Sequence, residues 1–398
     1  MKRIVISEIK KQLLKEIDSL KDKMGLIKAG SPNYNRFFGR DSLIVSWQLL
    51  ENNPEICKKT LEVLSKSQGK KINKEREEEP GKILHETDFK RKRHPESYFP
   101  FPYYGSVDSA SLYLIISYFY FQKIKDKKFL RKYWKNILAA INWMEKYGDK
   151  DKDLFLEYQR KNKNALFHQG WKDGFKNHLR IKPPVAIVEV QGYQYLALKS
   201  SATLAKILRK NKISKELLKK AERLKKEFNK KFWMADKKYF ALALDGKKLQ
   251  KKTITSNPGH LLFTGILEKD KERQTVQRLF QKDLWTPFGI RTHSSKELDF
   301  NPLSYHKGSI WPHDNWIIAQ GLKKLGYKKE YQKIKKAILK AFLELGYLPE
   351  LYGVVDNKIV EIPRACYPQA WASGALLNFF FLKFYNKSFH IHQSFFLD

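Results

Sequence analysis

The sequence predicts an all-α protein in which paired helices close into a ring. Apolar residues recur at helical spacing in about twelve segments, from Ser7–Met24 to Pro368–Tyr385. No segment has the length and pattern of a sheet-forming strand, so the strand–helix alternation of a parallel sheet is missing. The loops after alternate helices differ from one another and are rich in Trp, Tyr, Asp and Glu. Because a linear stack of hairpins would have loops of similar composition, we expect a closed toroid whose loops converge at one end.

Helix start and stop signals divide the first half of the chain. The predicted helices there are Ser7–Met24, Leu43–Leu50, Pro54–Ser67, Ser106–Ile124 and Lys128–Tyr147. Asp41 and Ser42 precede the second of these helices and are favourable N-cap residues. The polar run KKINKEREEEPGKILHE contains proline and glycine, so we expect a long exposed loop before the fourth helix.

The second half continues the same pattern. Its predicted helices are Val188–Arg209, Lys215–Trp233, Ser256–Leu267, Lys271–Gln281, Ser309–Leu325, Lys329–Leu345 and Pro368–Tyr385. The short stretch Tyr239–Leu244 favours a strand or a turn. We expect residues 1–398 to form a single domain, with the helix of residues 1–30 packed on the ring.

Composition bounds the class of protein. Lys and Arg total 78 against 42 for Asp and Glu, which gives a net charge of +36. These cations are spread along nearly every helix at solvent-facing spacing, so we interpret them as solvated helix faces and consider nucleic acid an unlikely partner. Cys57 and Cys366 are too few for a disulfide framework and lack metal-site spacing. Since neither a signal peptide nor a membrane-spanning apolar run is evident, we expect a soluble cytoplasmic protein.

The most informative loop is LFHQGWKDGF, which carries Asp173 two residues after Trp171. An aromatic loop with one carboxylate suggests a concave, partly dry site, because ordinary loops are polar. An indole beside a carboxyl group removes water from it and raises its pKa, which suits the group to donate a proton. Asp173 is therefore the candidate general acid.

A second carboxyl group stands far along the sequence. Glu350 follows a predicted helix end in the segment YLPELYG, where its neighbours are apolar. The alternative is an ordinary solvated loop glutamate, although the Leu-Pro and Leu-Tyr setting is unusual for one. Only the fold could bring Glu350 to Asp173.

Polar and aromatic residues in two further loops have two interpretations each. Arg40 and Asp41 in NRFFGRDS could clamp sugar hydroxyls or could form a helix cap with a salt-bridged neighbour. Trp311 in HKGSIWPHDN could stack on a sugar ring or fill the core. His306 and His313 are seven residues apart and lack a third ligand, so we expect no metal site.

Other loop residues complete the candidate set. Gln369 and Trp371 lie at the start of the last predicted helix, in PQAWASG. Asp108 in GSVDS and Glu86 in KILHE are further loop acids, and each is more often structural than catalytic.

Taken together and in order, these segments resemble a known enzyme family. The motifs are FGRDSL, PGKILHE, YYGSVDS, QGWKDG, VEVQGYQYLAL, YHKGSIWPHDN, LPELYG and YPQAWASGAL. They resemble the catalytic domain of the glycogen-debranching amylo-α-1,6-glucosidases. More broadly, they are similar to the glucoamylase-like clan of six-hairpin, (α/α)6-barrel glycoside hydrolases.

The resemblance implies an inverting, exo-acting α-glucosidase acting on an α-glucan or oligosaccharide. Asp173 is then the general acid and Glu350 the general base, while Arg40 and Asp41 clamp the non-reducing-end glucose. Residues implied to line the same pocket are Trp171, Lys172, Glu189, Gln191, His306, Trp311, Gln369 and Trp371. No metal or organic cofactor is expected, because both steps are proton transfers.

The sequence departs from the resemblance and leaves alternatives open. Gly174 stands where relatives often carry Ser, and Lys307 where Arg is common. The chain has no room for the N-terminal β-rich domain of relatives or for an α-amylase-like transferase module. One alternative is a sister activity on trehalose, a glucosyl- or mannosyl-glycerate, or another α-glycoside. Another is a non-catalytic carbohydrate- or nucleic-acid-binding protein, which would need no acid and base pair. The oligomeric state is left open.

Overall fold

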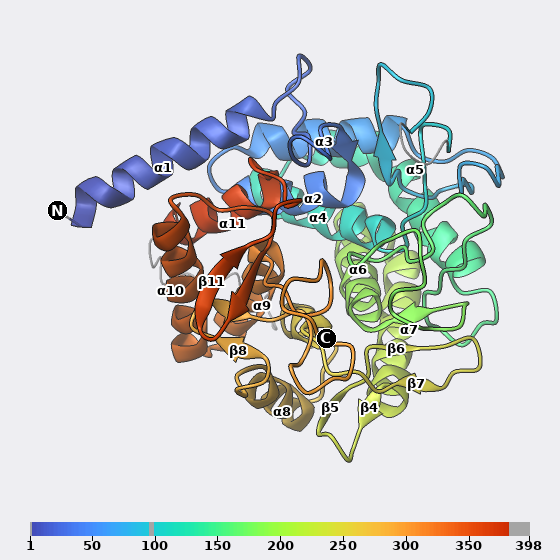
Figure 1. The fold of residues 1–398 in the computed structure, drawn as a ribbon. Helices are drawn as coiled ribbons and strands as arrows, with labels where there is room; N and C mark the ends of the chain where they lie inside the picture. The colour runs from blue at the N-terminus through green and yellow to red at the C-terminus, as the bar shows by residue number, and fades with distance from the viewer. Residues whose placement is uncertain (1, 95–98, 382–398) are drawn as a thin grey trace.

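The computed structural model describes residues 2–94 and 99–381, and their helices run once around a closed ring (Figure 1). The inner ring comprises α2 (Gly39–Leu49), α4 (Ser109–Ile124), α6 (Val188–Ile207), the 3-10 helix η2 (Asn257–Phe263), α9 (Pro312–Leu325) and α11 (Ala370–Phe381). The outer helices are α1 (Lys2–Ser19), α3 (Pro54–Lys66), α5 (Lys127–Trp143), α7 (Asn211–Lys231), α8 (Lys269–Leu279) and α10 (Lys328–Leu345). Each inner helix contacts the next, and α11 contacts α2, so the ring closes. The expected all-α (α/α)6 toroid is confirmed.

The inner and outer helices differ in how much of their surface is buried. In α4, every residue from Ser109 to Tyr118 is buried, as expected for a helix surrounded by others. In α7, by contrast, the buried apolar residues Leu217, Leu224 and Phe228 recur at intervals of one or two turns, while most of its lysines remain exposed. The outer helices therefore carry much of the basic excess on their solvated faces.

Short antiparallel strands pair with one another within and between the loops. The pairs are β1 (Phe37–Phe38) with β2 (Glu86–Thr87), β4 (Trp233–Met234) with β5 (Tyr239–Phe240), β8 (Trp285–Thr286) with β9 (Gly289–Ile290), and β10 (Tyr352–Val355) with β11 (Lys358–Glu361). A three-stranded sheet joins β3 (Ala186–Ile187), β6 (Ala243–Leu244) and β7 (Gln250–Lys251). Because β1 and β3 lead directly into α2 and α6, they fix where these inner helices begin.

Several sequence expectations need correction. Within the expected helix Ser256–Leu267 the structure has the short 3-10 helix η2, and Gly321 of α9 packs closely against its residues Leu262 and Phe263. The β10–β11 hairpin was not expected, although its turn residues Asp356 and Asn357 adopt the positive φ angles typical of tight hairpins. The first helix ends earlier than predicted, and the part of the last predicted helix beyond residue 381 lies outside the described residues. The strand expected within Tyr239–Leu244 is confirmed as β5 and β6.

The first turns of the inner helices meet at one end of the ring. Arg40 in α2 donates to Asp108, which precedes α4, and the rings of Trp311 and Trp371, at the starts of α9 and α11, lie 6.0 Å apart. Helix N-termini carry partial positive charge, so this end is suited to hold carboxylates. None of the helices within the described ranges combines the length and the apolar run that a bilayer crossing requires.

Gly321→Ala tests how closely α9 and η2 approach each other. A Cβ atom at residue 321 would lie 2.5 Å from Leu262 Cβ and 2.7 Å from Phe263 N. At an open helical position Gly→Ala stabilises by up to about 1 kcal/mol, but here we expect a loss of about 1–3 kcal/mol from overpacking. Chemical denaturation measures the difference. A stability equal to or above that of the wild type would show that the contact is looser than described.

Candidate active site

A pocket of about 350 Å³, counting the space at its mouth, opens at the end of the ring where the inner helices begin. Its lining residues are Tyr34, Phe38, Arg40, Asp41, Trp171, Asp173, Tyr305, His306, Trp311, Glu350 and Trp371. Aromatic rings and a few carboxyl and hydroxyl groups together form the kind of lining that binds a small polar ligand such as a sugar. Asp173 and Glu350, distant in sequence, therefore line the same pocket.

Three indole rings build the pocket wall. The ring of Trp311 lies 5.7 Å from that of Trp171 and 6.0 Å from that of Trp371. The indole N–H of Trp311 donates to the main-chain oxygen of Tyr305 at 2.8 Å, which fixes its orientation. Within the described residues, the buried Nε1 atoms of Trp171 and Trp371 have no hydrogen-bond partner. These two N–H groups are free to donate to a ligand.

Asp173 is held by an ion pair that spans two inner helices. Arg40 donates through Nη1 to Asp173 Oδ2 at 2.9 Å and through Nε to Asp108 Oδ2 at 2.7 Å. Ser106 donates to the other oxygen of Asp108 at 2.6 Å. Burial raises the pKa of Asp173, and Arg40 opposes that increase. Because no hydrogen bond within the described residues reaches Asp173 Oδ1, this oxygen can carry a proton toward a ligand.

Glu350 is almost fully buried and accepts three hydrogen bonds. Tyr305 Oη donates to Oε1 at 2.6 Å, Gln369 Nε2 to Oε1 at 3.3 Å, and Cys366 N–H to Oε2 at 3.1 Å. Burial raises the pKa of Glu350 to about 7, and the three donors oppose that increase by favouring the ionised form. Glu350 and Asp173 therefore differ in surroundings: one carboxyl group is surrounded by donors, whereas the other has a free oxygen.

Asp41 lies in the same pocket, and its surroundings differ from those of both Asp173 and Glu350. Its carboxyl group is buried and accepts no hydrogen bond from another side chain of the described residues. Burial raises its pKa to about 8, against the opposing charge of Arg40. A buried acceptor without a protein partner is costly unless a ligand satisfies it. Asp41 is thus suited to accept from the hydroxyl groups of a sugar.

Two residues expected in the pocket lie behind its wall. Lys172 follows Trp171 in the chain, but its Nζ points away and donates to the main-chain oxygen of Thr292 at 2.6 Å. Burial lowers the pKa of Lys172 to about 8. Glu189, at the start of α6, is fully buried and is not among the lining residues. Of these neighbouring loop residues, Trp171 and Asp173 line the pocket and Lys172 does not.

Gln191 and Gln369 also serve the protein rather than the pocket surface. The side-chain amide of Gln191 exchanges two hydrogen bonds of 2.9 Å with the backbone of Leu156. Gln369 donates to Glu350 and accepts from the backbone of Ala370, which orients the glutamate. The two amides were expected to line the pocket. In the structure they hold the backbone and Glu350 in place instead.

Sequence reasoning missed three lining residues and placed one of two histidines in the lining. Tyr34, Phe38 and Tyr305 line the pocket, and each lies within or next to a motif already singled out, NRFFGRDS or YHKGSIW. His306 lines the pocket as expected, and its buried Nε2 has no partner within the described residues. His313 instead stacks on Trp371, with ring centres 3.7 Å apart.

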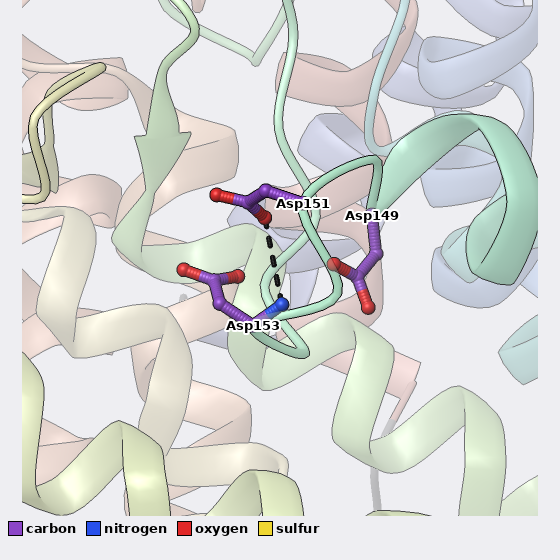
Figure 2. A group of neighbouring side chains, drawn as sticks. All are labelled: Asp149, Asp151 and Asp153. Carbon is purple, nitrogen blue, oxygen red and sulfur yellow. Dashed lines mark hydrogen bonds between the residues drawn. The ribbon is translucent and has the colours of Figure 1, made fainter.

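A separate acidic group could hold a cation. Asp149, Asp151 and Asp153 offer oxygens within 4.8 Å of one another and come from one loop (Figure 2). Lys248 Nζ lies 2.7 Å from both Asp151 and Asp153 and also contacts Glu157. Its ammonium group already neutralises part of this charge. None of these residues lines the pocket, so the group takes no part in the site.

Two sequence comparisons relate the chain to known proteins. A family model described as a mannosylglycerate hydrolase MGH1-like glycoside hydrolase domain matches residues 120–353. Mannosylglycerate hydrolase MGH1 of Selaginella moellendorffii is 27% identical over 75 residues, which is 19% of this chain and only 15% of that relative.

Solved structures support the fold. A GH63 mannosylglycerate hydrolase of Thermus thermophilus in complex with Tris gives a TM-score of 0.72 at 13% identity, covering 94% of this chain and 100% of that one. Its complex with glucose gives a TM-score of 0.73 at 15% identity, over the same shares of each chain. The complex with Tris and D-glycerate gives 0.71 at 13% identity, again over 94% and 100%.

Asp41→Asn tests whether burial raises the pKa of the Asp41 carboxyl group in the pocket. The folded state holds the Asp41 proton up to about pH 8, whereas the unfolded chain loses it near the ordinary aspartate pKa. Stability therefore falls as pH rises from about 4 to 8, because the folded state binds more protons there. We expect Asp41→Asn to raise stability on the order of 1–3 kcal/mol at pH 8 and little at pH 4.

Thermal unfolding of the purified protein at both pH values measures this difference. Asp270→Asn is the matched control, because the Asp270 side chain is 83% exposed on α8. An equal stability change at both pH values would contradict the raised pKa of Asp41.

Proposed function

The chain belongs to the family of mannosylglycerate hydrolase MGH1-like glycoside hydrolase domains, and we propose on this premise that it hydrolyses an α-linked sugar–glycerate conjugate with inversion. Asp173 is the general acid and Glu350 the general base. The observation that carries the proposal is the placement of these two carboxyl groups in one pocket with contrasting surroundings. The action we propose is exo, on a single non-reducing-end sugar.

The two carboxyl groups divide the proton transfers. Asp173 Oδ1 donates its proton to the glycosidic oxygen. The bond between that oxygen and the anomeric carbon then breaks, and its electron pair stays on the oxygen. Glu350 takes a proton from a water molecule, whose oxygen bonds to the anomeric carbon from the opposite face. The products are glycerate and a sugar of inverted configuration. One proton leaves Asp173 and one reaches Glu350, so solvent must restore both groups between turnovers.

The surroundings of each carboxyl group support this division. Three donors favour an ionised Glu350, while Asp173 has one donor and a free oxygen. Arg40 would favour an ionised Asp173, but Asp108 shares the same guanidinium. The charge of Asp173 also contributes to the raised pKa of Glu350, so ionisation of the first carboxyl group disfavours ionisation of the second. Excluding water when the sugar binds favours the protonated acid.

The family match favours glycerate conjugates over glucans. The sequence resemblance identifies the six-hairpin glycosidases, but the match is to a mannosylglycerate hydrolase-like domain rather than to debranching enzymes. The named relative and the solved structures are mannosylglycerate hydrolases as well. Glycerate is an anion, so a cation without an acidic partner near the pocket would strengthen its binding.

Arg364 is such a cation. Its guanidinium lies 5.6 Å from the centre of the Tyr305 ring, which lines the pocket, and the residue is exposed. The described residues provide it with no ion-pair partner. In contrast, Arg36 near the mouth is paired with Glu86, and Lys307 is paired with Asp299 at 2.8 Å. Arg364 is therefore the cation we assign to the glycerate carboxylate.

Removing either carboxyl group tests the assignment of roles. We expect Asp173→Asn and Glu350→Gln each to lower kcat on α-mannosyl- or α-glucosyl-glycerate by about 10³-fold or more, because each loses a proton transfer. Steady-state assays of released sugar measure the rate, and circular dichroism confirms folding. Asp356→Asn in the exposed β10–β11 turn is the control and should keep full activity. Substantial turnover by either variant would remove that residue from its role.

A matched pair of substrates tests glycerate recognition. The glycerol conjugate of the same sugar differs from the glycerate conjugate only by replacing the carboxylate with a hydroxymethyl group. We expect Arg364→Met to lower kcat/KM for the glycerate conjugate by about 10-fold or more and to leave the glycerol conjugate nearly unchanged. Arg273→Met, on the solvated face of α8, is the matched control. An equal loss of kcat/KM on both substrates would show that Arg364 does not recognise the glycerate carboxylate.

A further inference from the structure

Tyr305 connects several parts of the pocket through one side chain. Its hydroxyl lies 2.6 Å from Glu350 Oε1 and 3.0 Å from the hydroxyl of Tyr34. Its main-chain oxygen accepts the indole N–H of Trp311. Its ring is 4.8 Å from the ring of Trp311 and carries Arg364 on one face. Tyr305 therefore contacts both the expected base and the Trp311 side chain.

The hydroxyl of Tyr305 has one proton, and its partners decide where that proton goes. An ionised Glu350 can only accept, so Tyr305 donates to it. Tyr305 can also donate to the Tyr34 hydroxyl, but that contact is longer, at 3.0 Å, and its acceptor is uncharged, so the proton goes to Glu350. Burial and the negative charge of Glu350 hold the pKa of Tyr305 well above its usual range, so the phenol remains a donor rather than an acid. Tyr305 is therefore a donor to Glu350.

The donors on Glu350 are distributed unequally between its two oxygens. Oε1 accepts from both Tyr305 and Gln369, which fills both of its acceptor positions. Oε2 accepts only from the Cys366 N–H, and one acceptor position is left. The backbone N–H of Glu350 also donates to the Cys366 oxygen at 2.9 Å, which ties the glutamate to the loop before α11. Only Oε2 has room for the proton of a water molecule.

We propose that Tyr305 is a positioning residue for the base: by occupying Oε1 it presents Oε2 of Glu350 to the attacking water. The proposal rests on the function proposed above and adds a residue to it. The hydroxyl of Tyr305 touches the carboxyl group and not the breaking bond, so its effect passes through Glu350. Loss of that hydroxyl removes the shortest donor on Oε1 and frees the carboxyl group to rotate. The charged form of Glu350 also loses stabilisation.

The pH profile separates this role from a purely structural one. Activity requires an ionised Glu350, so it rises with pH through the pKa of that group, which lies at about 7. The Tyr305 hydrogen bond lowers this pKa, and removing the bond raises it. The acidic limb of the pH profile is the range in which kcat/KM rises with pH. In Tyr305→Phe we expect this limb to move to higher pH by about 0.5–1 unit. We also expect kcat at the pH optimum to fall by about 10-fold or more. KM should change little, because the sugar contacts remain.

Two further variants accompany this measurement. Tyr34→Phe keeps the bond between Tyr305 and Glu350, so its acidic limb should move less than that of Tyr305→Phe. Tyr239→Phe also removes a buried hydroxyl, one that donates to the Thr255 main-chain oxygen at 2.8 Å, and it lies outside the pocket. It should leave the acidic limb in place even where it lowers the melting temperature.

The outcomes are distinguishable. An unmoved acidic limb in a folded Tyr305→Phe protein, with Glu350→Gln inactive, would overturn the positioning role and keep the proposed function. An active Glu350→Gln variant would overturn the proposed function itself. Should Tyr305→Phe fail to fold, 3-fluorotyrosine at residue 305 preserves the contacts and makes the hydroxyl a stronger donor. The acidic limb should then move to lower pH, and an upward or absent shift would contradict the proposal.

Discussion

The closure of the inner ring by α11 against α2 is the contact on which the site depends. Gln48 Nε2 donates to the main-chain oxygen of Trp371 at 2.9 Å, and Asn378 Nδ2 donates to the main-chain oxygen of Gln48 at 2.6 Å. These buried bonds join α2 to α11, which lie next to each other where the ring closes (Figure 1). Because the inner helices all begin at the same end, closure places Arg40 of the first inner helix beside the loops that carry Asp173 and Glu350.

Charge is concentrated where the ring closes, at a cost to stability. Asp41 and Glu350 are buried carboxyl groups with pKa values raised to about 8 and about 7, and Asp173 is raised as well. Arg40 is the cation that opposes this charge, and Asp108 holds its guanidinium in place. Groups kept in such surroundings cluster at functional sites, where their perturbed pKa values serve proton transfer. The fold tolerates them because the surrounding helices are extensively packed.

Much of the fold and part of the site could be predicted from the sequence. Helical periodicity and unlike aromatic loops were sufficient for a closed all-α ring, and the motifs identified the acids that line one pocket. The direction of individual side chains could not be read from motifs, so Lys172 and Gln191 were assigned to the pocket although they bond to the main chain behind it. Tyr305 was missed because its role arises from a hydrogen bond to Glu350, a residue distant in sequence.

The central claim is that water and the leaving oxygen occupy opposite faces of one anomeric carbon, each served by its own carboxyl group. Proton NMR of the first minutes of hydrolysis of an α-mannosyl-glycerate or α-glucosyl-glycerate measures this most directly, because the released sugar keeps its initial configuration until it mutarotates. Inversion predicts that the β-anomer appears first and the α-anomer follows by mutarotation. Release of the α-anomer first would contradict the account, since it requires attack on the same face.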